Sequence, residues 1–223
     1  MVMASGNEPQ IKGSVRSQDL SVSWISESGT AEKNTDRVCI LMMANGQIRL
    51  TMQSSTIDLK GMRLTKGHIC VFALFESSDD EVADKASEIF MNMIMRYDIT
   101  KKPSADVLRK CMSKTEKKID KEFKGSGYKA SVAAFAAKDL TVCTAGGGRV
   151  FIISDDDNIQ ETASDTMEIL PIGQTWKNVM IASGSYPAAC DQVKQDIRLP
   201  IGDMITKLRS LPHPSSVIRV QRI

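Results

Sequence analysis

The order of the apolar segments constrains the fold of this chain more than any other feature. Amphipathic helices are predicted at residues 81–97 and 103–124, because apolar side chains recur there at helical spacing. Short apolar or alternating segments, typical of strands, both precede and follow this helical pair. Helices grouped between runs of hairpin-linked strands predict an α+β fold with largely antiparallel sheets, and argue against a doubly wound parallel sheet.

The predicted strands form one group before the helices and one group after them. The first group is residues 20–25, 38–43, 48–52, 57–59 and 68–75, and the second is 130–136, 140–144, 149–154, 179–182 and 217–220. Short helices are predicted at residues 188–197 and 201–208. Residues 1–16 are polar with little apolar periodicity. We therefore expect a flexible tail over residues 1–16 and a single compact domain over residues 17–223.

The composition excludes several classes of protein. Of the 223 residues, 42% are hydrophobic and 25% are charged, which excludes a disordered, collagen-like or coiled-coil chain. The 29 Lys and Arg nearly balance the 27 Asp and Glu, which argues against a nucleic-acid partner. No apolar stretch is long enough to span a bilayer, so we expect no membrane partner.

The cysteines indicate the compartment. There are five, an odd number, widely spaced and without a CxxC pair. This pattern favours reduced thiols over a disulfide framework or a zinc site. We therefore expect an intracellular protein, cytoplasmic or nuclear.

Five stretches, in order along nearly the whole chain, resemble the motifs of one known family. They are residues 29–37 (GTAEKNTDR), 71–80 (VFALFESSDD), 127–151 (GYKASVAAFAAKDLTVCTAGGGRVF), 179–193 and 215–223. The family is the metal-dependent type 2C Ser/Thr protein phosphatases, or PPM-type phosphatases. The resemblance implies a four-layer α-β-β-α sandwich, with two antiparallel sheets flanked by helices. It also implies a site in which two divalent metals activate a water for attack on phosphorus.

The first two motifs depart from the family at the metal site. By the resemblance, the bridging Asp corresponds to Glu76, which keeps a carboxylate on a longer side chain. The Gly next to it corresponds to Ser77. The opening motif keeps Asp36, but Thr35 stands where the family has Glu. Asp36 and Glu76 are therefore interpreted as vestigial metal-ligand positions.

The later motifs have lost their acidic residues altogether. By the resemblance, further metal-ligand positions correspond to Gly147, Gly184 and Ser215, and the phosphate-binding Arg corresponds to Ala31. The region at residues 155–178 is shorter than in the family, and the family's flap and its Arg-x-Phe/Leu-Gly-Asp motif are missing there. Two metals bring about four positive charges, which need several converging carboxylates. We expect neither catalytic residues nor a bound metal cofactor.

Three functions follow from this interpretation. The first is a pseudophosphatase that acts by protein–protein binding or regulation. The second is a weak or altered phosphatase that uses Asp36 and Glu76 with Mg²⁺ or Mn²⁺. The third is a structural subunit of a larger assembly. The sequence indicates neither the partner's identity nor the oligomeric state.

Other charged and glycine-rich segments have simpler interpretations. A lysine stripe on the second long helix is a possible surface for a protein partner, although a solvated helix face explains it as well. Its members are Lys110, Lys114, Lys117, Lys118 and Lys121. Asp79 and Asp80 are interpreted as stabilising a helix N-terminus, residues 155–158 as a turn, and residues 146–148 as a tight turn rather than a phosphate loop.

Overall fold

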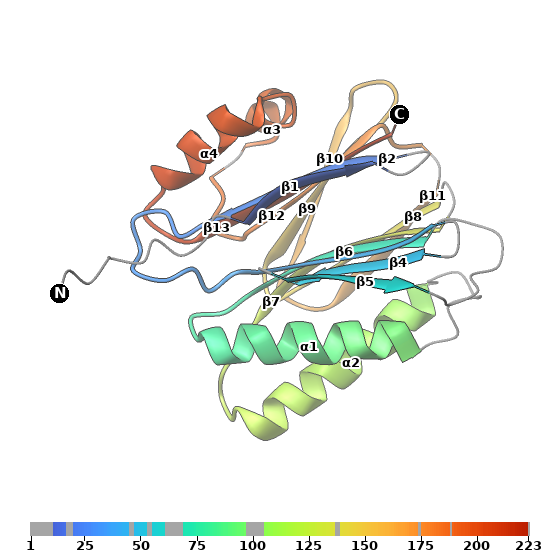
Figure 1. The fold of residues 1–223 in the computed structure, drawn as a ribbon, viewed down its shortest axis with the longest axis vertical. Helices are drawn as coiled ribbons and strands as arrows, with labels where there is room; N and C mark the ends of the chain where they lie inside the picture. The colour runs from blue at the N-terminus through green and yellow to red at the C-terminus, as the bar shows by residue number, and fades with distance from the viewer. Residues whose placement is uncertain are drawn as a thin grey trace.

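The chain folds into four layers. The computed structural model describes residues 11–16, 20–44, 47–52, 55–60, 69–96, 105–136, 139–173, 175–187 and 189–222. Two antiparallel sheets face each other, and a pair of helices covers the outer face of each (Figure 1). This arrangement confirms the predicted α-β-β-α sandwich.

One sheet has seven described strands and carries the two long helices. Its order is β11 (Glu168–Gly173), β8 (Asp139–Ala145), β7 (Lys129–Ala136), β6 (Ile69–Glu76), β3 (Arg37–Ala44), β4 (Gln47–Met52) and β5 (Ser55–Lys60). Helices α1 (Asp80–Arg96) and α2 (Ala105–Glu122) lie on its outer face (Figure 1). Every neighbouring pair of strands is antiparallel.

The other sheet has six described strands. Its order is β1 (Ile11–Arg16), β2 (Leu20–Glu27), β13 (Ser215–Arg222), β12 (Asn178–Ala182), β9 (Gly148–Ile153) and β10 (Ile159–Ser164). Helices α3 (Cys190–Asp196) and α4 (Ile201–Arg209) cover its outer face (Figure 1). These pairings are also antiparallel.

Strand β6 shows why the central strands are apolar without alternation. Val71 and Phe75 face the core beneath α1 and α2, whereas Phe72 and Leu74 face the core between the sheets. A strand buried on both faces needs apolar side chains at successive positions. Phe72 also contacts Phe135 within the core between the sheets, with ring centroids 5.4 Å apart.

Three strands were not predicted. Residues 11–16, assigned to the flexible tail, form β1 and pair with β2 from Ile11↔Ser26 to Arg16↔Ser21, so that part of the prediction is wrong. Strand β1 is held by backbone hydrogen bonds to β2, and a weak pattern of apolar residues does not reveal such bonds. Residues 1–10 of the predicted tail lie outside the described residues. The region at residues 155–178 contributes β10 and β11, one to each sheet.

Two further findings concern the cysteines and membrane spans. All five cysteines are free thiols, four of them buried and Cys190 exposed. In the described ranges, no helix is both long enough and apolar enough to cross a membrane.

Candidate functional site

A hollow of about 540 Å³ lies where the ends of β6, β7 and several loops meet. Its lining residues are Thr35, Asp36, Glu76, Ser77, Ser78, Gly127, Tyr128, Lys129, Gly146, Ser185, His213 and Pro214. The hollow therefore brings together Thr35, Asp36, Glu76 and Ser77, the four positions that the first two motifs single out. Asp36 and Glu76 are far apart in the sequence.

Asp36 is held by hydrogen bonds from within the protein. It precedes β3, and its side chain is only 3% exposed. The Ser183 hydroxyl donates to Asp36 Oδ2 at 2.7 Å, and the backbone N–H of Asp36 donates to Asn34 Oδ1 at 3.0 Å. Burial raises the pKa of the Asp36 carboxyl, while hydrogen bonds from Ser183 and Ser216 oppose the rise.

Glu76 ends β6 and is equally enclosed. Both of its carboxyl oxygens accept the backbone N–H of Gly184, at 2.8 and 2.9 Å. Burial, and after it the negative charge of Asp36, raises the pKa of Glu76 to about 8. Gly184, Lys129 and Arg149 act in the opposite direction. At neutral pH the Glu76 carboxyl is therefore mostly protonated.

Lys129 brings a positive charge to the same place. It begins β7 and stands directly opposite Glu76 in the β6–β7 register. A Cβ added at Gly184 would lie 2.8 Å from Lys129 Nζ, so the lysine occupies the space that a side chain at position 184 would need. Sequence reasoning missed Lys129. The available signal was the pairing of Glu76 with the start of β7, since opposite charges face each other across neighbouring strands.

The other predicted positions lie around the hollow, with one exception. The carbonyl oxygen of Gly147 lies 3.0 Å from the added Cβ at Gly184. The Ser215 hydroxyl lies 3.2 Å from that of Ser185, which lines the hollow. The Ser77 hydroxyl donates to the carbonyl oxygen of Gly127 at 2.9 Å. Ala31 does not line the hollow, and its N–H donates to the carbonyl oxygen of Ser28.

The donor set does not fit a two-metal centre. Hard divalent cations need several oxygen ligands that converge on a small volume. Among the described residues, two carboxyl groups line the hollow, those of Asp36 and Glu76, and both are buried and hydrogen-bonded by the protein. Across the described residues, no group of three or more His, Cys, Asp or Glu side chains could hold a metal ion.

The acidic segments have the local roles predicted for them. Asp79 Oδ1 accepts the N–H of Glu81 at 2.9 Å, which caps the start of α1. Asp156 accepts hydrogen bonds from Ser154 and Asn158 within the turn between β9 and β10. Gly146 and Gly147 have φ of 62° and 85°, which suits the tight turn predicted between β8 and β9.

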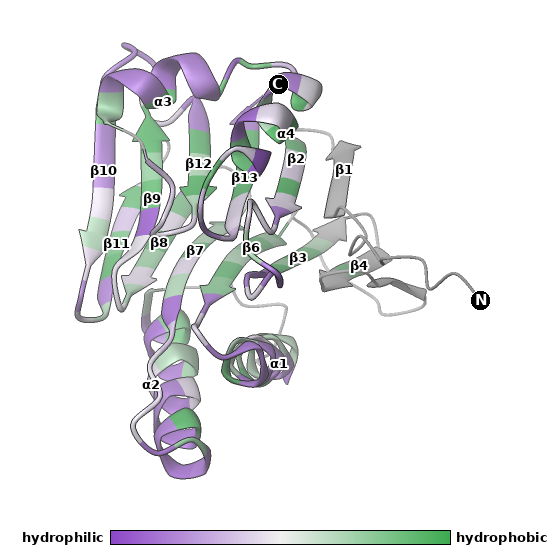
Figure 2. Cartoon of the chain, turned by 90° about the vertical axis from the view of Figure 1, so that its left-hand side faces the viewer, coloured by the Kyte–Doolittle hydropathy of each residue, from purple (hydrophilic) through white to green (hydrophobic). Residues whose placement is uncertain are grey.

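The lysine stripe lies on the solvent side of α2. All five of its members are exposed, while Leu108, Cys111, Met112, Thr115 and Ile119 form the buried face. Figure 2 shows the hydrophilic colouring that covers most of this helix. In the described part of the chain, no carboxylate lies within salt-bridge distance of the five lysines, whose charges are therefore available to a partner.

Solved structures place this fold among known proteins. RsbX, in a complex with magnesium, has a TM-score of 0.62 and 11% identity over 96% of this chain and 100% of that one. The catalytic domain of the serine/threonine phosphatase PstP, with two manganese ions, has a TM-score of 0.61 and 12% identity over 92% and 99%. This chain has a type 2C phosphatase-like fold.

A third similar structure is PppA, described as a key regulatory component of the T6SS in Pseudomonas aeruginosa. It has a TM-score of 0.59 and 10% identity, over 95% of this chain and 100% of that one. No protein-family model and no curated protein sequence matches the chain. At these identities, the similarity establishes the type 2C phosphatase-like fold alone.

Proposed function

We propose that this protein is a pseudophosphatase, a catalytically inactive phosphatase-like protein that acts by binding another protein. One observation carries the proposal. The hollow at the end of the sandwich has two carboxyl groups, Asp36 and Glu76, and both are already hydrogen-bonded by Ser183 and Gly184. Asp36 Oδ2 and both carboxyl oxygens of Glu76 therefore already have protein donors, which a pair of cations would have to displace.

The charge of the hollow supports the same conclusion. Metal-assisted hydrolysis of a phosphate ester depends on cations that lower the pKa of a bound water. Here Lys129 already lowers the pKa of Glu76 through its charge, which is the effect that a bound cation would also have. The ammonium of Lys129 can balance the charge of one carboxylate. It cannot coordinate and activate a water molecule as a metal ion does, so it provides no nucleophile.

The lysine stripe of α2 is the surface we assign to the partner. Its charges are exposed, and the apolar side of the same helix is packed on the sheet. An acidic protein surface complements such a stripe, because opposite charges speed encounter and fix orientation. A protein-binding role therefore has a surface separate from the hollow.

The first expected result concerns metal and stability. Millimolar Mg²⁺ or EDTA is expected to leave the melting temperature unchanged within about 1 °C, because a ligand stabilises a protein only by binding its folded state. Differential scanning fluorimetry in matched ionic strength measures this, with Mg²⁺ compared against the same charge concentration of Na⁺.

A Glu76→Gln variant makes this measurement specific. If Mg²⁺ raised the melting temperature of the natural protein by several degrees and left the variant unchanged, a metal site would exist at Glu76. That result would support the weak or altered phosphatase instead. An equal small change in both proteins would reflect ionic strength and would leave the proposal standing.

The second expected result concerns the partner. Lys117→Glu is expected to reduce capture of the protein's partner about threefold or more, because charge reversal removes an attraction and adds a repulsion. Lys194→Glu is the matched control, since Lys194 is exposed on α3, away from the stripe. Quantitative pull-down from the source cells measures both. Equal capture by the two variants would remove α2 as the partner surface.

A further inference from the structure

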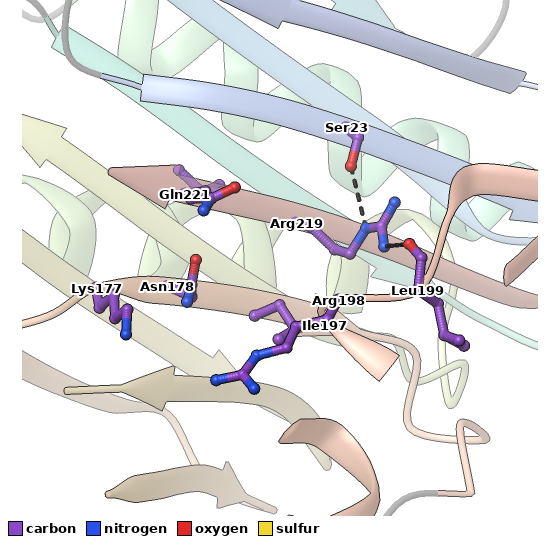
Figure 3. A pocket seen from close by; sticks show the side chains of 9 residues that line it. Ser23, Lys177, Asn178, Ile197, Arg198, Leu199, Arg219 and Gln221 are labelled. Carbon is purple, nitrogen blue, oxygen red and sulfur yellow. Dashed lines mark hydrogen bonds between the residues drawn. The ribbon is translucent and has the colours of Figure 1, made fainter. Parts of the chain in front are cut away.

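A second cavity, of about 470 Å³, lies on the outer face of the six-stranded sheet. Ser23, Arg219 and Gln221 of β2 and β13, and Asn178 of β12, form its floor. The segment at residues 197–199, which joins α3 to α4, forms its wall (Figure 3). Neighbouring strands align these side chains, since Arg219 pairs with Ser23 and Gln221 pairs with Asn178. The size is that of a small-molecule site.

Arg219 is a buried cation without a matching anion. Its residue is 9% exposed. Nε donates to the Ser23 hydroxyl at 3.1 Å, and Nη1 donates to the carbonyl oxygen of Leu199 (Figure 3). Both acceptors are neutral. Burial lowers the pKa of the Arg219 guanidinium, which reflects the cost of holding this charge away from water.

The carboxylate of Asp196 is already hydrogen-bonded by other side chains. Arg219 contacts Asp196 only at its backbone carbonyl oxygen. The Asp196 carboxylate accepts hydrogen bonds from Lys207, Tyr186 and Gln192 instead. Of the residues that the structure describes, none offers Arg219 a carboxylate at salt-bridge distance. The guanidinium therefore keeps an unbalanced charge at the cavity.

Two more cations stand at the same cavity. Lys177 and Arg198 both line it, and both approach Asp157 Oδ1, at 3.3 and 3.8 Å. The single carboxylate of Asp157 therefore balances the charge of one of these two partly exposed cations, and the other charge stays in excess. No Asp or Glu is among the lining residues. With Arg219 included, the cavity carries about two positive charges in excess.

We propose that this cavity binds the phosphoryl group of a small ligand. A phosphate monoester carries close to two negative charges at neutral pH, which matches the excess. A guanidinium donates paired N–H groups to such oxygens, and the amide groups of Asn178 and Gln221 add neutral donors beside it (Figure 3). A recessed cavity of this volume can enclose a small molecule, whereas the flat surface of a protein partner would not enter it.

This site is independent of the proposed pseudophosphatase function. Strand β13 connects the two places, with Ser215 near the hollow and Arg219 and Gln221 toward the opposite end. A ligand that contacts both the strand floor and Arg198 also bridges the sheet to the segment between α3 and α4. Loss of phosphatase activity neither requires this site nor excludes it.

Titration with inorganic phosphate and with adenosine monophosphate, followed by amide NMR shifts at constant ionic strength, tests the proposal. Saturable shifts are expected at Asn178, Arg198 and Leu199. Arg198→Glu and Lys177→Glu are expected to weaken binding about tenfold or more, because each replaces an attractive charge by a repulsive one. Lys194→Glu, which makes the same charge change on α3 outside the cavity, is expected to weaken it less than about twofold.

The relative affinities of the two probes distinguish a phosphate ester from free phosphate. Tighter binding of adenosine monophosphate identifies a phosphate ester as the ligand class, and tighter binding of phosphate identifies the free ion. Shifts that do not saturate, or that are equal in Arg198→Glu and Lys194→Glu, would overturn the proposal. Arg198→Glu and Lys194→Glu both change exposed side chains, so this comparison does not depend on a change at the buried Arg219.

Discussion

In millimolar Mn²⁺, the purified protein is expected to hydrolyse an aryl phosphate and a phosphoserine peptide no faster than its Glu76→Gln variant does. The type 2C phosphatase reaction needs a metal-activated water, and the described lining of the hollow offers two enclosed carboxyl groups, those of Asp36 and Glu76. Enzymes commonly accelerate their reactions by about a millionfold or more, so the assay separates activity from its absence by a wide margin.

The Glu76→Gln variant also controls for contaminating phosphatases. Both proteins are purified in the same way, so a trace contaminant gives the same rate in each. An active type 2C phosphatase assayed beside them checks the metal and the substrates. A rate that scales with the concentration of the natural protein and falls about tenfold or more in Glu76→Gln would contradict the pseudophosphatase proposal.

The central elements could be predicted because burial leaves a strong pattern in the sequence. The continuous apolar run before Glu76 predicts a strand buried on both faces, and β6 is such a strand. The helical spacing after residue 80 predicts α1 and α2 to within a few residues at each end. In both cases the buried faces of the element contact a core, so the pattern of apolar side chains indicates the type of element.

Three of the four edge strands, β1, β10 and β11, could not be predicted for the opposite reason. Strand β10 has the sequence IQETAS, and only Thr162 is buried in it. Figure 2 shows the mainly hydrophilic colouring of this strand. Its position depends on backbone hydrogen bonds with β9, from Ile159↔Ile153 to Ser164↔Gly148. Such bonds are nearly independent of side-chain type, so a hydrophobic pattern does not reveal them.

The candidate site was predicted in part. The resemblance brought Asp36 and Glu76 together, and the hollow contains both. It did not indicate Lys129, because a lysine at the start of a strand is ordinarily a solvated residue. Its significance depends on the β6–β7 register, which places it opposite Glu76. Ala31 lies outside the lining of the hollow, since a turn stabilised by the carbonyl of Ser28 holds it elsewhere.

Glu76→Gln is also expected to change how stability depends on pH. The pKa of Glu76 is raised from 4.5 to about 8, first by burial and then by the charge of Asp36, against the opposing effects of Gly184, Lys129 and Arg149. A carboxyl group whose pKa is raised on folding contributes stability below its unfolded pKa and loses it as pH rises through the folded pKa. The natural protein should therefore lose stability between about pH 4.5 and pH 8 through this group.

The variant removes that loss because glutamine does not ionise. Its free energy of unfolding should match that of the natural protein near pH 4.5 and exceed it by on the order of 5 kcal/mol near pH 9. Urea unfolding at a series of pH values measures the difference. Glu116→Gln, at an exposed position of α2, is the control and should show no such trend. A Glu76→Gln difference that stayed constant with pH would mean that this carboxyl ionises as easily in the folded protein as in the unfolded one.

Repeating the same series in EDTA and in Mn²⁺ connects stability to function. A metal bound at Glu76 would favour the ionised carboxyl, lower its pKa and remove the pH-dependent loss of stability. The enclosed pair of Asp36 and Glu76, with its hydrogen bonds to Ser183 and Gly184, is expected to give the same curve in both solutions. A slope that disappears only in Mn²⁺ would make Glu76 a metal ligand, and the weak phosphatase would then be the better description of this protein.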